Sequence, residues 1–255
     1  MLLTIDVGNT NTVLGLMKGT SLEARVRIRT VERTTDELGV LLLQAFGQRG
    51  VTPDDVTGAI IGSVVPSVLY SFDKACRRYF GVELMVVGKG LRTGIRVQTD
   101  NPREVGADRI VNSVAAIKRW GGPIVVVDFG TATTFDCVNT DNAYVGGAIA
   151  PGFGISEQAL FTSTAKLPRV EVRRPPRAIG TNTVHAIQSG LYYGYAGLVD
   201  ALARRCADEL APGAKVVATG GLAQLMAEPS TVIEEVDPFL TLRGLAHIYA
   251  LNSGA

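Results

Sequence analysis

The sequence predicts an α/β protein made of two copies of one unit, in which three strands precede alternating helices and strands. The first observation is a pair of matching turns, Asp-Val-Gly-Asn-Thr at 6–10 and Asp-Phe-Gly-Thr-Ala at 128–132, each at the end of an apolar strand. The second is the order of elements around them, which repeats between the two halves. Asp-x-Gly turns are common, so a chance pairing is the alternative. The matched strand order favours duplication.

Period-2 and apolar patterns predict the strands of the first half at 2–7, 12–17, 22–30, 58–65 and 82–87. Helical spacing predicts helices at 35–48, at 66–79 and from Pro102 onward. In the third strand Arg25, Arg27 and Arg29 alternate with Val26 and Ile28. This alternation indicates one buried and one solvated face, so the arginines are interpreted as a solvated face rather than as an anion site.

The second half is predicted to have strands at 124–127, 132–138, 144–149 and 215–218, and helices at 154–161, 183–210, 222–226 and 238–251. Gly190, Gly194 and Gly197 alternate with tyrosines within the long helix at 183–210. Glycine in a helix interior costs about 1 kcal/mol relative to alanine, which indicates a close approach of another element. A subunit interface and close packing inside the monomer explain it equally well.

Composition excludes several classes of function. Of 255 residues, 46% are hydrophobic, which is ample for a buried core, and 25 Lys and Arg balance 24 Asp and Glu. Without a basic surplus, nucleic acid is not expected as a partner. No apolar run approaches the roughly 20 residues that span a bilayer, and Asp6 interrupts any signal-peptide core. Three widely spaced cysteines predict a reduced cytoplasm and small buried side chains.

The first Asp-x-Gly turn has the composition of a phosphate-binding loop. It reads Asp-Val-Gly-Asn-Thr-Asn-Thr over residues 6–12 and joins two predicted strands. Gly8 lets the backbone approach an anion closely, and Asn and Thr side chains with nearby N–H groups can surround phosphate oxygens. Asp6 can face a hydrated Mg²⁺ that carries the phosphates. Taken alone, the loop is explained equally well as a plain hairpin turn.

The second copy of the turn favours nucleotide binding, because two such turns facing each other across a cleft would hold a triphosphate from both sides. Other nucleotide signatures are missing. Gly88-Lys89-Gly90 lacks the earlier glycine of a P-loop, and no G-x-G-x-x-G follows the first strand. The sequence therefore predicts a kinase rather than a P-loop NTPase or a dinucleotide-binding dehydrogenase.

A second polar cluster begins the helix after Pro102. Asp108 and Arg109 lie near the front of this helix, whose dipole favours anions. A kinase needs a carboxylate to accept the proton of the attacking hydroxyl and a cation to hold an acidic group. The two residues can fill these roles. On general grounds, an acidic first turn beside a solvated arginine explains them better.

Seven short motifs together resemble those of the type III pantothenate kinase family. They are DVGNTNT at 6–12, SVVP at 63–66, DNP at 100–102, GADR at 106–109, DFGTATT at 128–134, GGAIAPG at 146–152 and GTNT at 180–183. They cover nearly the whole chain in the family's order and spacing. The combination of GADR and DFGTATT is highly specific, and it decides in favour of the functional interpretation of Asp108.

The resemblance implies an actin-like (ribonuclease H-like) fold with two halves, 1–119 and 120–255, each a mixed sheet flanked by helices. It implies ATP-dependent phosphorylation of pantothenate to 4'-phosphopantothenate, the first step of coenzyme A synthesis, by a homodimer. The implied cofactors are Mg²⁺ with ATP and a monovalent cation, K⁺ or NH₄⁺.

The resemblance also implies roles for individual residues. The ATP phosphate loop corresponds to Asp6, Val7, Gly8, Asn9, Thr10, Asn11, Thr12 and Val13, and Asp6 would meet Mg-ATP, directly or through water. The pantothenate site corresponds to Gly106, Ala107, Asp108, Arg109 and Thr183, with Asp108 as the catalytic proton acceptor. Asp128 matches the monovalent-cation ligand and Thr131 an ATP contact. Relatives commonly have Tyr before Asp-Asn-Pro, where this chain has Thr99.

Two alternative functions are considered. A kinase of the same fold could act on a sugar or a carboxylate, but sugar kinases of this class place their base outside a GADR motif. A non-catalytic ATP-binding regulator would be indicated by loss of Asp6, Asp108 or Asp128, and all three are present. Incubation with Mg-ATP and a panel of acceptors would separate these alternatives.

Overall fold

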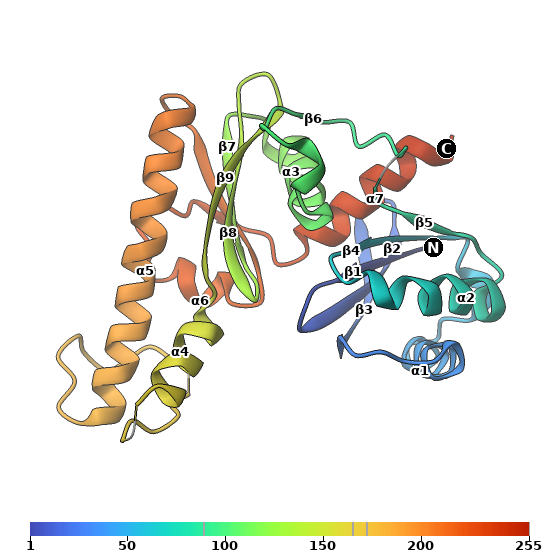
Figure 1. Cartoon of the computed structure of the whole chain (residues 1–255). Coiled ribbons are helices and arrows are strands. Elements are labelled where there is room, and N and C mark those ends of the chain that lie inside the picture. Colours follow the sequence, from blue (N-terminus) through green and yellow to red (C-terminus); the bar gives the residue numbers. More distant parts are fainter. Residues whose placement is uncertain (89, 165, 172, 255) are drawn as a thin grey trace. The chain divides into compact units, whose positions relative to one another are not determined.

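The computed structural model describes residues 1–88, 90–164, 166–171 and 173–254. The chain forms two compact units, each built on one β-sheet (Figure 1). Unit 1 comprises Met1–Ile95, Arg103–Ala115 and Leu240–Ala255, and unit 2 comprises Arg96–Pro102 and Ala116–Phe239. Both units combine strands and helices, as the fold class predicted.

The sheet of unit 1 has the strand order β3-β2-β1-β4-β5. Its strands are β1 (Leu2–Val7), β2 (Asn11–Lys18), β3 (Ser21–Arg29), β4 (Gly58–Ser63) and β5 (Leu84–Val86). The first three strands are antiparallel neighbours, and β1, β4 and β5 are parallel. This mixed topology places the carboxyl end of β1, where Asp6 lies, beside the end of β4.

One face of this sheet packs on α1 (Thr35–Gly47) and α2 (Leu69–Phe80), which lie side by side (Figure 1). Thr34 begins α1 with a capping box, because its hydroxyl accepts from the Glu37 N–H while the Glu37 carboxylate accepts from the Thr34 N–H. Leu42 and Phe46 are buried on the sheet side together with Leu3 of β1. This apolar layer fixes the face to which alternate residues of β1 point.

The other face of the sheet carries α7 (Leu240–Ser253). Glycines allow this close approach, since a Cβ added at Gly15 would lie 2.8 Å from Leu242 Cδ1 and one at Gly58 would lie 2.1 Å from Tyr249 Oη. The closing helix therefore packs on the first sheet, whereas the sequence assigned 238–251 to the half at 120–255. The sheet on which this helix packs is determined by contacts between segments far apart in the sequence. Local sequence patterns therefore could not predict it.

Gly244 gives a stability test of this packing. A Cβ at Gly244 in α7 would lie 2.2 Å from the backbone oxygen of Val111 in α3 (Ala107–Trp120). Backbone cannot move as easily as a side-chain end, so Gly244→Ala is expected to lower the free energy of unfolding by about 1–3 kcal/mol. Gly47→Ala is the control, because nothing lies within 4 Å of its added Cβ. Urea unfolding that shows equal stability for wild type and Gly244→Ala would contradict this packing.

The sheet of unit 2 has the order β11-β10-β7-β8-β9-β6. Its strands are β6 (Arg96–Val97), β7 (Ile124–Phe129), β8 (Ala132–Val138), β9 (Ala143–Pro151), β10 (Lys215–Gly220) and β11 (Glu235–Val236). The predicted apolar core of β7 is confirmed, since residues 124–127 are completely buried. The two-residue strands β6 and β11 were not predicted, because two residues carry no periodicity.

The helices of unit 2 are α4 (Phe153–Thr162), α5 (Thr183–Leu210) and α6 (Ala223–Ala227). Tyr192 and Tyr195 of α5 are buried in the apolar cluster formed with β7 and β8. Gly190, Gly194 and Gly197 are exposed instead, and a Cβ at any of them would meet nothing within 4 Å. Close packing inside the chain therefore does not explain these three glycines.

Short 3₁₀ helices occur at Pro53–Asp55, Pro66–Val68 and Pro102–Glu104. The helix expected at 66–79 thus begins as a 3₁₀ turn at Pro66 and becomes α-helical at Leu69. In the described part of the chain, no helix is long and apolar enough to cross a membrane.

The cysteines differ in the pKa of their thiols. Burial, with a contribution from Asp73, raises the pKa of Cys76 to about 12. A hydrogen bond from Cys137 lowers the pKa of the half-buried Cys206 to about 7, against the opposing effects of burial and Glu209. The expectation of buried side chains is confirmed for Cys76 and Cys137 only.

Because the thiolate is the nucleophile, iodoacetamide at pH 7.5 should alkylate Cys206 before Cys76 in the native protein. The rate at Cys206 should rise as the pH passes through 7, since deprotonation follows the lowered pKa. Peptide mapping after brief labelling measures both sites at once. Equal labelling of Cys206 and Cys76 would contradict the difference between the pKa values of their thiols.

Candidate active site

The loop between β1 and β2 is a tight turn at the edge of unit 1. The Gly8 N–H donates to the Asn11 carbonyl over 3.0 Å, and a Cβ at Gly8 would lie 3.2 Å from that oxygen. Asn9 and Thr10 at its tip are exposed, while Asp6 is half-buried where β1 ends. The loop therefore has the open tip and the adjacent carboxylate that the sequence predicted for phosphate binding.

Thr30 holds this loop from the end of β3. Its N–H donates to the Thr10 carbonyl over 3.0 Å, and its hydroxyl donates to the Gly8 carbonyl over 2.7 Å. The same hydroxyl lies 2.9 Å from the Thr12 hydroxyl, which is buried. The sequence did not single out Thr30, because its role depends on the pairing of β3 with β2.

Asp108 and Arg109 lie in the first turn of α3 and are half-buried. The Arg109 N–H donates to Asp108 Oδ1 over 2.9 Å, so the carboxylate is held against its own helix start. Glycine at position 106 leaves room for the carboxylate in this orientation, because a Cβ there would lie 2.4 Å from Asp108 Oδ1. The Asp108 carboxylate therefore has a fixed orientation.

The start of α3 and the end of β1 belong to one packed region of unit 1. Val111, one turn after Asp108, places Cγ2 3.9 Å from the Cβ position of Gly62. Gly62 pairs directly with Asp6 across the parallel strands β1 and β4. The structure thus brings together the GADR segment and the phosphate loop, two motifs about 100 residues apart in the sequence.

In unit 2, Asp128 lies near the end of β7 and is half-buried. Its Oδ1 lies 2.5 Å from the Cβ position of Gly220, which has φ +95° at the end of the neighbouring strand β10. Any other residue at Gly220 would meet both the carboxylate and a disfavoured backbone conformation. The carboxylate of Asp128 therefore lies directly against the backbone at Gly220.

The turn that follows Asp128 presents Thr131. The Gly130 N–H donates to the Ala132 carbonyl over 3.1 Å, and Thr131 is exposed. Gly152 at the start of α4 lies directly against this turn, since a Cβ added at Gly152 would lie 2.0 Å from the carbonyl oxygen of Thr131. The GGAIAPG motif thus ends on the glycine that lets α4 approach the second Asp-x-Gly turn.

Thr183 begins α5 and is exposed. The helix start is fixed by Asn182, whose side chain accepts from the His185 N–H over 2.9 Å. Thr183 lines a pocket of about 650 Å³. The other lining residues are Leu160, Leu167, Gly180, Thr181, Asn182, Ala186, Ile187, Gly190 and Leu191.

Thr99, which stands where relatives commonly have tyrosine, is half-buried in unit 2. Its hydroxyl oxygen is buried and has no hydrogen-bond partner among the described residues. A buried hydroxyl without a partner is costly, so this position could donate to or accept from a ligand group.

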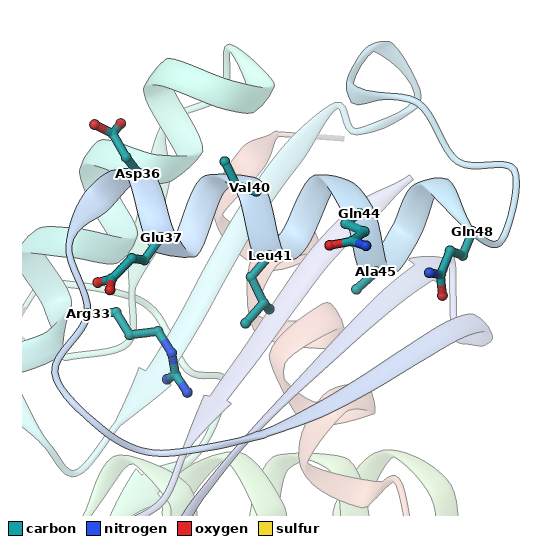
Figure 2. A pocket seen from close by; sticks show the side chains of 8 residues that line it. All are labelled: Arg33, Asp36, Glu37, Val40, Leu41, Gln44, Ala45 and Gln48. Atoms are coloured by element: carbon teal, nitrogen blue, oxygen red, sulfur yellow. The ribbon is translucent and has the colours of Figure 1, made fainter.

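A larger hollow of about 790 Å³ follows one face of α1 and has no predicted site residue in its lining (Figure 2). Its lining consists of Arg33, Asp36, Glu37, Val40, Leu41, Gln44, Ala45 and Gln48. No catalytic carboxylate, nucleophile and base come together there. The hollow is a groove on the surface of the helix rather than a candidate active site.

The candidate metal ligands are single carboxylates. No group of three or more His, Cys, Asp or Glu side chains that could hold a metal occurs in the described parts of the chain. Mg²⁺ usually keeps several waters and binds through one or two carboxylates plus phosphates, and a half-buried Asp6 beside the open loop fits this. The half-buried carboxylate of Asp128 supplies oxygen, the ligand atom that a hard cation takes.

Solved structures define the class of fold. The chain matches a protein from Campylobacter jejuni described as a Baf family transcriptional activator, with a TM-score of 0.62, 19% identity, and coverage of 99% of this chain and 100% of the other. It also matches the activator of 2-hydroxyisocaproyl-CoA dehydratase from Clostridium difficile, with a TM-score of 0.58, 14% identity and coverage of 99% and 94%. The fold is that of actin-like ATPases and sugar kinases.

Sequence comparisons then identify the family. A family model described as type III pantothenate kinase matches residues 2–205. Type III pantothenate kinases from Myxococcus xanthus and Anaeromyxobacter sp. (strain Fw109-5) are 53% and 54% identical over 253 residues, covering 99% of this chain and 99% and 100% of their own. The chain belongs to the type III pantothenate kinase family.

Proposed function

We propose that this protein transfers the γ-phosphoryl group of ATP to pantothenate and so forms 4'-phosphopantothenate, the first step of coenzyme A biosynthesis. The observation that carries this proposal is the fixed position of Asp108, whose helix packs against the strand pair that contains Asp6. Family membership over residues 2–205 supports the choice of acceptor. The test is direct: protein, Mg-ATP, K⁺ and pantothenate should yield ADP and phosphopantothenate in equal amounts.

The chemistry follows from these positions. The pantothenate hydroxyl oxygen attacks the γ-phosphorus, and the bond from that phosphorus to the bridging oxygen of ADP breaks. Asp108 accepts the hydroxyl proton, and Arg109 beside it offers a cation to the acidic substrate. The loop from Asp6 to Val13 holds the phosphates, Thr131 contacts ATP, and Gly106, Ala107 and Thr183 contact pantothenate.

We propose Asp6 as the carboxylate that faces Mg-ATP, directly or through water, and Asp128 as the ligand of K⁺ or NH₄⁺. When bound, these cations offset phosphate charge. We further propose that the protein acts on small molecules in the cytoplasm, a proposal that rests on its family membership.

Thr30→Val tests whether the fixed loop matters for nucleotide binding. The substitution keeps the shape of the side chain but removes the hydroxyl contacts to Gly8 and Thr12. Losing hydrogen bonds worth about 1 kcal/mol each should raise KM for ATP roughly 10-fold while KM for pantothenate stays constant. Thr30→Ser keeps the hydroxyl and should restore the wild-type value. An unchanged KM for ATP in Thr30→Val would show that the Thr30 hydroxyl does not contribute to nucleotide binding.

We also propose a homodimer in which residues near Thr183 complete the pantothenate site of the partner. The exposed glycines of α5 leave an open face for close helix approach, and Tyr193 is exposed beside them. Small residues and rigid aromatics are favoured at interfaces, and two-fold dimers are the commonest soluble oligomers. Light scattering should therefore give twice the chain mass, and a monomer mass would refute the dimer.

Mixing two inactive variants tests the shared site. In a mixed dimer of Asp108→Asn with Thr183→Trp, one pocket carries both changes and the other carries neither. Part of the wild-type activity should therefore return after subunit exchange. If exchange is verified by mass spectrometry and no activity returns, each site belongs to one chain.

A further inference from the structure

Strand pairing places two arginines of β3 in line with the phosphate loop. Asp6 of β1 pairs with Val13 of β2, and Val13 pairs with Arg27 of β3. Side chains of directly paired residues point to the same face of a sheet. Arg27 therefore shares a row and a face with Asp6.

Arg29 lies one step further toward the tip of the loop. It pairs with Asn11, the first residue after the turn. Residues two apart on a strand point to the same face, so Arg29 and Arg27 are on the same side. Neighbouring strands are about 4.8 Å apart, so the Arg27 backbone lies two strand spacings, roughly 10 Å, from that of Asp6.

The helix on this face meets the row of Asp6, Val13 and Arg27 only at Gly62 of β4, on the side of Asp6 away from Arg27. Leu242, Leu245 and Tyr249 of α7 lie against Gly15, Gly62 and Gly58, respectively. Arg27 and Arg29 are both exposed, and Val13 between Arg27 and Asp6 is only half-buried. The corner of the sheet that holds the two arginines is therefore accessible to a ligand on the loop.

Both guanidinium groups are available. Within residues 1–88, 90–164, 166–171 and 173–254, neither the Arg27 nor the Arg29 side chain makes a hydrogen bond or an ion pair. Their backbones pair with β2, and the Arg29 carbonyl also accepts from Arg33 Nη1. A guanidinium presents a planar fork of N–H donors that matches phosphate oxygens. Two such groups beside the loop can hold an anion with several phosphates.

We propose that Arg27 and Arg29 bind the polyphosphate of the nucleotide from the β3 side of the loop. This inference rests on the proposed function, and it assigns to nucleotide binding two residues that the alternating sequence pattern indicated as a solvated face. A ligand phosphate would extend across Val13 from Asp6 toward these two side chains. Adenosine, which lacks phosphate, would not use them.

The experiment measures Mg-ATP and adenosine binding by calorimetry at fixed ionic strength for wild type, Arg27→Gln, Arg29→Gln and the double variant. Each single change should weaken Mg-ATP binding roughly 10-fold, as expected for a lost hydrogen-bonded charge contact, and the double change should weaken it further. Adenosine binding and KM for pantothenate should stay at wild-type values. Arg27→Lys should keep part of the affinity.

Arg25→Gln is the matched control, because Arg25 is on the same strand and face but pairs with Gly15, one step further from the loop. It should bind Mg-ATP as wild type does. An equal loss in Arg25→Gln would show a general effect of surface charge and overturn the proposal. So would unchanged Mg-ATP affinity in the double variant, or a loss confined to pantothenate.

Failure of the proposed function gives a different pattern. If wild type does not phosphorylate pantothenate but binds Mg-ATP and loses affinity in Arg27→Gln, the acceptor is wrong and the arginine assignment stands. If wild type phosphorylates pantothenate and the variants bind Mg-ATP normally, only the arginine assignment fails. Unfolding temperatures of all variants, compared with wild type, identify any loss that comes from misfolding.

Discussion

Asp108→Asn is expected to lower kcat by roughly 10²–10⁴-fold while Mg-ATP binding stays at the wild-type level. Asparagine has the same shape and can still accept the Arg109 N–H, so the start of α3 should keep its geometry. It cannot accept a proton from the attacking hydroxyl at neutral pH. The loss should therefore appear in the chemical step rather than in nucleotide binding.

Single-turnover measurements with excess enzyme separate the chemical step from product release. Asp54→Asn is the control for removing one negative charge from unit 1, because Asp54 is exposed in a 3₁₀ helix. It should leave kcat unchanged. Near wild-type turnover in Asp108→Asn would exclude Asp108 as the proton acceptor.

The second large effect concerns the monovalent cation. With sodium as the only monovalent cation, turnover should be poor, and potassium or ammonium should restore it. Asp128 is half-buried and its carboxylate lies against the backbone at Gly220, which suits a weakly hydrated cation better than a strongly hydrated one. Asp128→Asn should lower kcat by roughly 10²-fold and weaken the response to potassium.

Asp141→Asn is the control in the same unit, since Asp141 is an exposed loop residue. It should keep the full potassium response. Equal rates in sodium, potassium and ammonium with wild-type protein would contradict a monovalent-cation site. A normal potassium response in Asp128→Asn would show that residues other than Asp128 bind the monovalent cation.

Local patterns predicted much of the site because its main parts are short segments. The turn at Asp6, the apolar strand before Asp128 and the first turn of the helix with Asp108 each have a local signature of glycine, strand or cap chemistry. Their structures agree with these predictions. The assignment of a role to each residue needed the resemblance, because an acidic first turn is not specific.

Other features depend on pairing between distant segments. The hydrogen bonds of Thr30 and the alignment of Arg27 with Asp6 follow from the register of β1, β2 and β3. The docking of α7 on the first sheet depends on glycines in β2 and β4. Alternation in β3 predicted correctly that its arginines are exposed, but it could not show which ligand-binding loop they accompany.

Pantothenate as the acceptor of the phosphoryl group is central to the proposed function. The most direct measurement incubates the protein with Mg-ATP and potassium, separately with pantothenate, with a panel of sugars and with acetate, and follows ADP and phosphorylated product by mass spectrometry. Pantothenate alone should gain one phosphoryl group per ADP formed, and Asp108→Asn should abolish that signal. Phosphorylation of a sugar or acetate, with pantothenate unchanged, would contradict the account.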